Sequence, residues 1–171
     1  VFKVNEKAVI PSFATEGSAC FDLQACFDEG QKIKTYNVWN KAVDVPAKVI
    51  RGKVAFQLTP GHRALIPTGL IFDIPEKHVL KIYNRSSTGL KKGLILPNGV
   101  GVVDSDYVNE SFIIMQNVSE SLVVIEDGER LAQGMLEPIQ VVYDWRKPKP
   151  NRSRKQVAPV GLVVLVKENL L

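Results

Sequence analysis

Short apolar segments separated by turn residues are the feature that most restricts the fold of this chain of 171 residues. Each segment is rich in Val, Ile, Leu or Phe, and turn residues such as Pro67-Thr68-Gly69 lie between them. Strands of this length and spacing predict an all-β sandwich or barrel. No segment has a long 3.6-residue apolar period, and only residues 87–92 suggest a helical turn. We expect strands at residues 54–58, 63–66, 70–74, 78–83, 111–116 and 122–125.

The composition is that of an ordinary globular domain, with 45% hydrophobic and 23% charged residues. No apolar run approaches the roughly 20 residues that a membrane helix needs, so we expect no membrane partner. The first ten residues show no signal-peptide pattern. Cys20 and Cys26 lie in one extended segment, where six residues span roughly 20 Å and exclude a disulfide. Reduced cysteines fit a cytoplasmic protein, or one of the nucleoplasm or a host's cytoplasm if the source is eukaryotic or viral.

The net charge of +4 is unevenly distributed. Six basic residues and no acidic residue lie between Arg146 and Lys155. Such a block can hold nucleic acid or a phosphate-bearing ligand. Because it contains no aromatic residue, we favour a solvated segment and expect no nucleic-acid partner.

We expect two parts in the chain. Residues 1–145 form a β domain, in which residues 31–58 are an insertion that adds a β-hairpin. Residues 146–171 form a basic linker and a C-terminal arm, because Lys147-Pro148-Lys149-Pro150 predicts a stiff, extended connector. The apolar segment at residues 157–166 must bury against this subunit or a neighbour.

Three polar segments carry candidate chemistry. Asn84-Arg85-Ser86-Ser87-Thr88-Gly89 follows an apolar strand, and its guanidinium, hydroxyl and backbone donors could hold a polyphosphate. Asp104 follows Val102-Val103, so we expect it at a strand end facing a pocket, where an ionised carboxylate could accept a proton from water. In the third segment, residues 128–134, Gln133 could donate to a phosphate oxygen, whereas Glu129 and Arg130 favour structural roles.

Taken in order, residues 15–23, 84–93, 98–109 and 128–133 resemble the four first motifs of the trimeric dUTPase family. The resemblance spans roughly residues 8–138, and four motifs in order are far more specific than any one alone. It implies a β jelly roll (β-clip) and a homotrimer with active sites at the subunit interfaces. The implied reaction is hydrolysis of dUTP to dUMP and pyrophosphate, which limits uracil in DNA and supplies dUMP for dTMP synthesis.

The resemblance also implies a role for each site residue. Asp104 would be the general base, orienting a water for in-line attack on the α-phosphorus. Tyr107 would pack against the deoxyribose and exclude a 2′-hydroxyl. Asp22 would support the site through the water shell of one Mg²⁺ ion, held mainly by the substrate phosphates, and Arg130 would be a second supporting residue. Uracil would be recognised near Asn98, Gly101 and Phe112. The phosphates would be held by Arg85, Ser86, Ser87 and Gln133.

The chain departs from the family pattern in three places. Cys20 stands where the family usually has glycine. Asn109 replaces another glycine, and asparagine tolerates positive φ well enough for the hairpin to survive. The glycine-rich C-terminal motif is missing, since residues 151–161 contain one glycine and no phenylalanine. Loss of a closing segment usually lowers the rate, because water exclusion suffers.

Two other functions remain open. The dCTP deaminase family shares the fold and an Arg-Ser-Ser motif, but it places a catalytic glutamate ten residues after the aspartate. That position is Ile114 in this chain, which cannot move a proton. The other alternative is a non-catalytic, nucleotide-binding regulatory homologue, which the degraded C-terminal motif and the insertion favour and the intact Asp104 and Tyr107 oppose.

Overall fold

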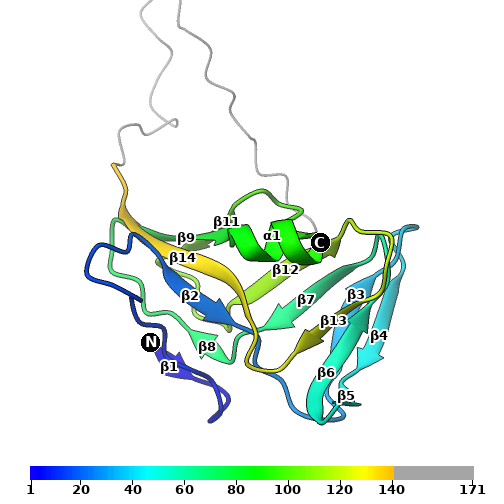
Figure 1. Cartoon of the computed structure of the whole chain (residues 1–171). Helices are drawn as coiled ribbons and strands as arrows, with labels where there is room; N and C mark the ends of the chain where they lie inside the picture. The colour runs from blue at the N-terminus through cyan, green and yellow to red at the C-terminus, as the bar shows by residue number, and fades with distance from the viewer. Residues whose placement is uncertain (141–171) are drawn as a thin grey trace, which may run out of the picture. The chain divides into compact units, whose positions relative to one another are not determined.

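The computed structural model describes residues 1–140, which belong to one compact unit (Figure 1). The expected boundary at Trp145, the basic linker and the C-terminal arm lie outside the described residues. No helix among residues 1–140 is long and apolar enough to cross a membrane.

A five-stranded antiparallel sheet forms one half of the domain. Its strand order is β10 (Leu94–Ile95), β12 (Phe112–Asn117), β7 (Arg63–Pro67), β3 (Lys32–Tyr36) and β4 (Ala42–Pro46). Side chains of β12 alternate strictly, so Ile113 and Met115 are buried while Phe112 and Ile114 are only partly covered. This period-two pattern is that of a strand with one face on the core, and it leaves the opposite sheet face open for a site.

A four-stranded antiparallel sheet forms the second half. It contains β11 (Gly101–Asp104), β9 (His78–Asn84), β14 (Arg130–Pro138) and β2 (Phe21–Gln24), in that order. A three-stranded sheet of β13 (Val123–Glu126), β6 (Lys53–Leu58) and β5 (Lys48–Ile50) and the short pair of β1 (Phe2–Lys3) and β8 (Leu70–Ile71) complete the fold.

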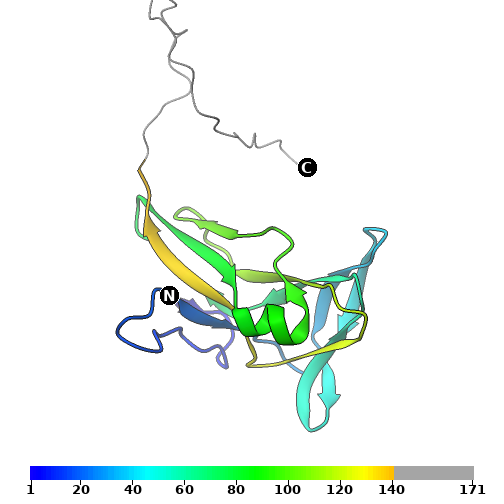
Figure 2. The ribbon, with the colours of Figure 1, turned by 45° about the horizontal axis from the view of Figure 1, so that its top comes forward.

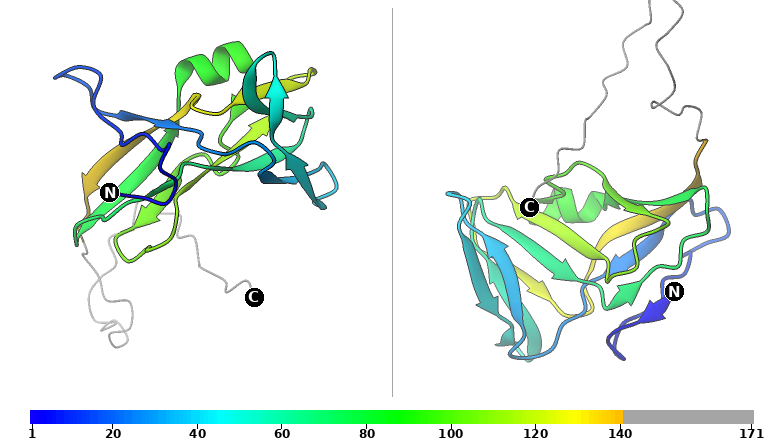
Figure 3. Two further views of the ribbon diagram at one scale, coloured as in Figure 1. Left: turned by 90° about the horizontal axis from the view of Figure 1, so that it is seen from below. Right: turned by 180° about the vertical axis from the view of Figure 1, so that it is seen from behind.

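The core lies between these sheets, which curve around it (Figures 2 and 3). Phe27 and Phe56 pack edge to face at its centre, with ring centroids 5.6 Å apart. Many large core side chains are at most 1% exposed, among them Leu23, Ile33, Ile66, Leu80, Ile113, Met115 and Ile125. Burial on this scale is the main source of stability for a β fold of this size. The architecture confirms the expected all-β jelly roll.

The inserted residues form two hairpins rather than one. The strands β3 and β4 make the first, which joins the five-stranded sheet at β7. The second, β5–β6, joins β13 and turns through Arg51 and Gly52, both with positive φ. Both hairpins (cyan) lie at the end of the domain opposite β1 and the N-terminus (Figure 1). The second hairpin was missed because Val49 and Val54 face each other across a turn that carries only Arg51-Gly52 as a signal.

The only helix described, α1 (Ser86–Lys92), is longer than the expected single turn. It ends at Gly93, whose left-handed conformation (φ 61°) lets its backbone N–H donate to the carbonyl of Gly89. Lys91 and Lys92 in the last turn favour the negative end of the helix dipole. A strand expected over residues 70–74 is shorter, because β8 has only the two-residue β1 as partner.

We predict that Gly93→Ala destabilises the domain more than an equally strained control. Left-handed φ costs a residue with a Cβ roughly 1–2 kcal/mol, and a Cβ at Gly93 would also lie 2.9 Å from the Cβ of Ser119. Gly30→Ala is the control, since Gly30 has φ +80° but no atom within 4 Å of an added Cβ. Urea unfolding should show the larger loss for Gly93→Ala, and equal losses would contradict the packing argument.

Candidate active site

An arginine–aspartate cluster joins three of the expected motifs. The carboxylate of Asp22, on β2, binds Arg85 Nε at 2.7 Å through Oδ1 and Arg130 Nη1 at 3.1 Å through Oδ2. Arg85 lies directly before α1, and its Nη1 also donates to the carbonyl of Arg130 and to Ser87 Oγ, at 3.2 and 3.3 Å. Two guanidinium groups around one carboxylate leave a net positive charge, which suits an anion.

The same cluster has room for a further acceptor. No described residue forms a hydrogen bond or ion pair with Arg85 Nη2, and Ser86 at the start of α1 is exposed. Gln133 lies opposite Asp22 in the β14–β2 register and opposite Tyr83 in the β14–β9 register, so it belongs to the cluster. Its Nε2 donates to the carbonyl of Asn84 at 3.0 Å, which ties β14 to the turn that carries Arg85. Gln133 therefore steadies the turn with one amide hydrogen.

A second group of expected residues lines a cavity of about 400 Å³ between β11 and β12, which we call the β11–β12 cavity. Its walls contain Asn98, Gly101, Tyr107 and Phe112, the four positions expected to contact a nucleoside. A volume of this size is within the range of small-molecule sites. The fold therefore places the four residues that we expected to contact a nucleoside in one cavity.

Asp104 ends β11, next to the cavity-lining Val103. It is exposed, and its carboxylate makes no hydrogen bond or ion pair with any residue of the described domain. Alternation along β11 places its side chain on the same face as that of Val102, which also lines the cavity. Asp104 lies at a strand end, as expected, beside the cavity-lining Val102 and Val103, but it is not itself among the residues that line the cavity.

The turn after Asp104 is held at both ends. The backbone N–H of Tyr107 donates to the Asp104 carbonyl at 3.1 Å, and Tyr107 Oη donates to the Glu110 carbonyl at 3.0 Å. Glu110 Oε1 accepts the backbone N–H of Gly69 at 2.7 Å, and Thr68 Oγ1 donates to the Ser111 carbonyl at 2.6 Å. These bonds fix the Tyr107 ring as a wall of the cavity.

We call the hydrogen bonds among Tyr107, Glu110, Gly69 and Thr68 the Tyr107 clamp. Gly69 is the position where this clamp requires glycine. Its φ is +68°, and an added Cβ would lie 2.8 Å from the Cβ of Ala8 and 3.0 Å from Cys26 Sγ. Asn109, by contrast, is not among the described residues with positive φ, so the hairpin does not need the conformational freedom that we expected there. Glu110 and Thr68 are positioning residues that sequence reasoning missed. The Pro67-Thr68-Gly69 turn was the available signal for Thr68.

Asp104 and the arginine–aspartate cluster lie toward opposite ends of β9. Asp104 faces Val79 in the β11–β9 register, whereas Gln133 and Asp22 align with Tyr83. Four residues along a strand separate them by about 13 Å, and three strand spacings across the sheet add about 14 Å. A general base acts within hydrogen-bond reach or through one water. Within one copy of the chain, Asp104 therefore lies too far from Arg85 and Arg130 to act on a phosphate that they bind.

Other reactive groups in the described domain offer no competing site. Cys20 and Cys26 are free thiols, as expected, and burial raises the pKa of both, which disfavours the nucleophilic thiolate. Glu129 binds Lys92 Nζ at 2.6 Å and so holds α1 against β14's turn, a structural role. Within residues 1–140, no group of three or more His, Cys, Asp or Glu side chains could hold a metal ion.

The chain is similar to known proteins over most of its length. A family model described as dUTPase matches residues 50–158. A deoxyuridine 5′-triphosphate nucleotidohydrolase of Aquifex aeolicus is 37% identical over 133 residues, which cover 78% of this chain and 72% of that protein.

Solved structures agree with the sequence comparison. The dUTPase of Streptococcus mutans aligns with a TM-score of 0.63 and 28% identity, over 82% of this chain and 94% of that one. A mutant dUTPase of phage phi11 of S. aureus, described with a structural Mg(II) ion, aligns with a TM-score of 0.62 over 88% and 96% of the two chains. At 18% identity, that second likeness shows the fold alone. With the family model and the Aquifex relative, these findings show that the chain belongs to the dUTPase family.

Proposed function

We propose that this member of the dUTPase family hydrolyses dUTP to dUMP and pyrophosphate, with Asp104 as general base. The observation that carries the proposal is the β11–β12 cavity, which gathers Asn98, Gly101, Tyr107 and Phe112 beside a strand that ends at Asp104. In a cell this reaction limits the incorporation of uracil into DNA and supplies dUMP for dTMP synthesis.

The proposed reaction needs a positioned water and neutralised phosphate charge, without a covalent nucleophile. A water held by the Asp104 carboxylate attacks the α-phosphorus in line and gives its proton to that carboxylate. The bond from the α-phosphorus to the oxygen that bridges to the β-phosphate breaks, and pyrophosphate leaves. Because no described residue binds the Asp104 carboxylate, both of its oxygens are available to the water.

The Tyr107 wall supports selection of a deoxynucleotide. Its hydroxyl donates to the Glu110 carbonyl, which restrains the ring against making room for a larger sugar. We infer that deoxyribose packs on this ring, where a 2′-hydroxyl would be excluded, and that uracil enters between Asn98, Gly101 and Phe112. An ordered ring keeps the entropic cost of binding low.

The donor chemistry fits a Mg²⁺ ion that the protein holds through its substrate. Both oxygens of Asp22 are bound by arginines, and the described residues offer no cluster of carboxylates for direct ligation. Mg²⁺ prefers oxygen ligands and retained waters, so the three phosphates would supply its oxygens and Asp22 would support its water shell. When bound, the ion neutralises phosphate charge. Arg85, Ser86, Ser87 and Gln133 would orient the phosphate chain.

We further propose a homotrimer in which each active site combines residues of different copies. The separation of Asp104 from Arg85 along β9 supports this assembly, because a second copy can supply the missing half. Closed cyclic symmetry then gives every copy the same contacts.

Deamination has no support in the described site. Ile114, at the position where the dCTP deaminase family has its glutamate, lines the β11–β12 cavity with an aliphatic side chain. An aliphatic side chain cannot donate or accept the protons that deamination requires. Supplying dCTP and assaying ammonia should therefore give no product.

The first prediction concerns the base. Asp104→Asn should abolish pyrophosphate release from dUTP with Mg²⁺, because an amide cannot accept the proton of water, whereas dUTP binding persists. The matched control is Asp106→Asn, which alters an exposed carboxylate of the same turn and should lose much less activity. Full turnover in Asp104→Asn would refute the base, and bound nucleotide without turnover in the unaltered protein would favour a regulatory binder.

The second prediction concerns the shared site. Asp104→Asn and Arg85→Gln should each be inactive alone, yet mixing them during refolding should restore about a quarter of wild-type activity, since random assembly of a cyclic oligomer places an intact base beside an intact arginine at that frequency. Mixing Arg85→Gln with Asp22→Ala is the control, because both changes damage the same cluster. No recovery in the first mixture, with mixed oligomers verified by mass spectrometry, would overturn the interfacial site.

The third prediction concerns the clamp behind Tyr107. Glu110→Ala removes the acceptor for the Gly69 N–H and should raise the KM for dUTP about tenfold, with a smaller change in kcat, because one hydrogen bond to a charged acceptor orders the hairpin. Glu110→Gln retains an Oε1 acceptor and should stay near the wild-type KM. Equal kinetics in the alanine and glutamine variants would contradict a positioning role.

A further inference from the structure

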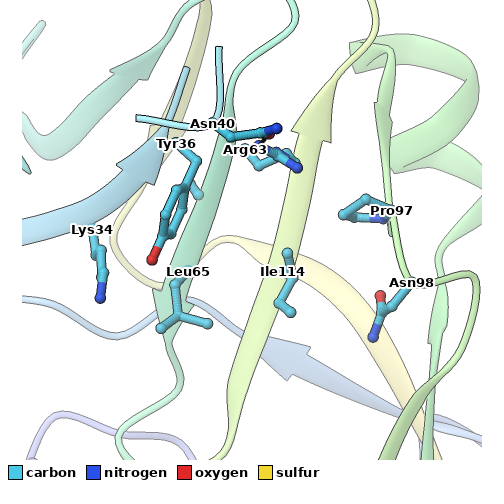
Figure 4. Close-up of a pocket in the computed structure, with 9 residues that line it drawn as sticks. Lys34, Tyr36, Asn40, Arg63, Leu65, Pro97, Asn98 and Ile114 are labelled. Carbon is cyan, nitrogen blue, oxygen red and sulfur yellow. Dashed lines mark hydrogen bonds between the residues drawn. The ribbon is translucent and has the colours of Figure 1, made fainter. Parts of the chain in front are cut away.

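A second cavity lies on the open face of the five-stranded sheet, beside the inserted hairpin. Its volume is about 530 Å³, and we call it the β3–β7 cavity. Leu65, Pro97 and Ile114 form its apolar floor and one wall, while polar groups stand at its ends (Figure 4). A mostly apolar cavity of several hundred cubic ångströms with a few convergent polar groups is the usual form of a small-molecule site.

The hairpin end of this cavity is cationic and ordered. Lys34 Nζ lies 5.6 Å from the ring centroid of Tyr36, and Arg63 Cζ lies 5.9 Å from it. Arg63 Nη2 also donates to Asn40 Oδ1 at 2.6 Å, which fixes the guanidinium. These contacts hold two positive charges around one aromatic ring before any ligand arrives.

No carboxylate balances these charges within the described part of the chain. Neither Lys34 nor Arg63 has an acidic partner among residues 1–140, and no acidic residue lines the cavity. Asp44 lies opposite Lys34 in the β3–β4 register but forms no ion pair with it. A cationic end above an apolar floor therefore favours an anion with a flat or apolar body.

The β3–β7 cavity adjoins the β11–β12 cavity. Leu65, Asn98 and Ile114 line both. Figure 4 shows Asn98 on the far side of Ile114 from Tyr36 and Lys34, so its amide stands at the end opposite the cations.

We propose that the β3–β7 cavity is a second nucleotide site, which holds a base over Leu65 and Ile114 and a phosphate on Lys34 and Arg63. The second site rests on the proposed function in one respect only: a nucleotide bound there changes the affinity for dUTP through the wall that the two cavities share. Coupling of this kind is reciprocal, so dUTP bound in the β11–β12 cavity changes the affinity of the second site by the same factor. The nucleotide is either a free mononucleotide or one unit of a DNA strand.

The test uses dAMP as the probe, titrated by calorimetry into the full chain with dUMP held at saturation. dAMP should bind without displacing dUMP. Lys34→Gln and Arg63→Gln should each weaken dAMP binding about tenfold, because each removes a charge-assisted contact to phosphate. Lys48→Gln is the matched control, since Lys48 is an exposed lysine of β5 outside the cavity, and it should leave dAMP affinity unchanged.

Several results would overturn the second nucleotide site. Displacement of dUMP by dAMP, absence of dAMP binding, or equal weakening by Lys48→Gln would overturn the second site. A smaller oligomer in Lys34→Gln by light scattering would overturn it too, because the surface would then be a contact between copies. If Arg63→Gln does not fold, the exposed Lys34 still supplies the test. A short oligo-dA strand that binds more tightly than dAMP, with the same variant dependence, identifies the strand as the source.

Failure of the proposed hydrolysis can be told apart from failure of this site. A chain that neither binds dUMP nor cleaves dUTP can still be titrated with dAMP alone, and the Lys34→Gln comparison is unaffected. Conversely, normal dUTP turnover with no dAMP binding refutes only the second site.

Discussion

The antiparallel register of β9 with its two neighbours is the constraint on which the rest of the site depends. On one side β11 places Asp104 opposite Val79, and on the other side β14 places Gln133 opposite Tyr83. Backbone hydrogen bonds set these pairings, and a shift by one residue would turn every side chain to the wrong face. The register of β9 therefore holds Asp104 apart from the arginine–aspartate cluster, and the proposed interfacial site rests on that separation.

The Asp22 carboxylate decides how the arginine–aspartate cluster is organised. It holds Arg85 from one motif and Arg130 from another, so three segments distant in sequence act as one unit. The side chains of Asp22 and Arg85 are about one quarter exposed. Partial burial strengthens such pairs relative to surface pairs, although removal of one partner leaves the other charge uncompensated. The cluster thus combines a fixed geometry with a remaining positive charge.

Much of this arrangement could be predicted from sequence, because the informative residues lie in local motifs. Asn98, Gly101, Tyr107 and Phe112 fall within one short stretch, so the hairpin that contains them also brings them together. The all-β class followed from strand lengths and turn residues, whereas the jelly roll was implied by the family resemblance.

The parts that sequence reasoning missed depend on distant pairs. Glu110 and Gly69 are 41 residues apart, and the Asp22–Arg130 contact joins residues separated by 108 positions. No period or motif in a single sequence encodes such contacts. The second hairpin of the insertion was missed for a different reason, since a short strand such as β5 carries too few residues to display an alternation.

The outermost strand of the five-stranded sheet has a consequence for solubility. β4 pairs only with β3 among the described strands, so one row of its peptide groups has no strand beside it. Open rows of this kind recruit further strands and seed fibrils. Pro46 ends the strand without an N–H, and Asp44 adds a charge at its middle. Both features discourage a foreign strand from extending the sheet at this edge.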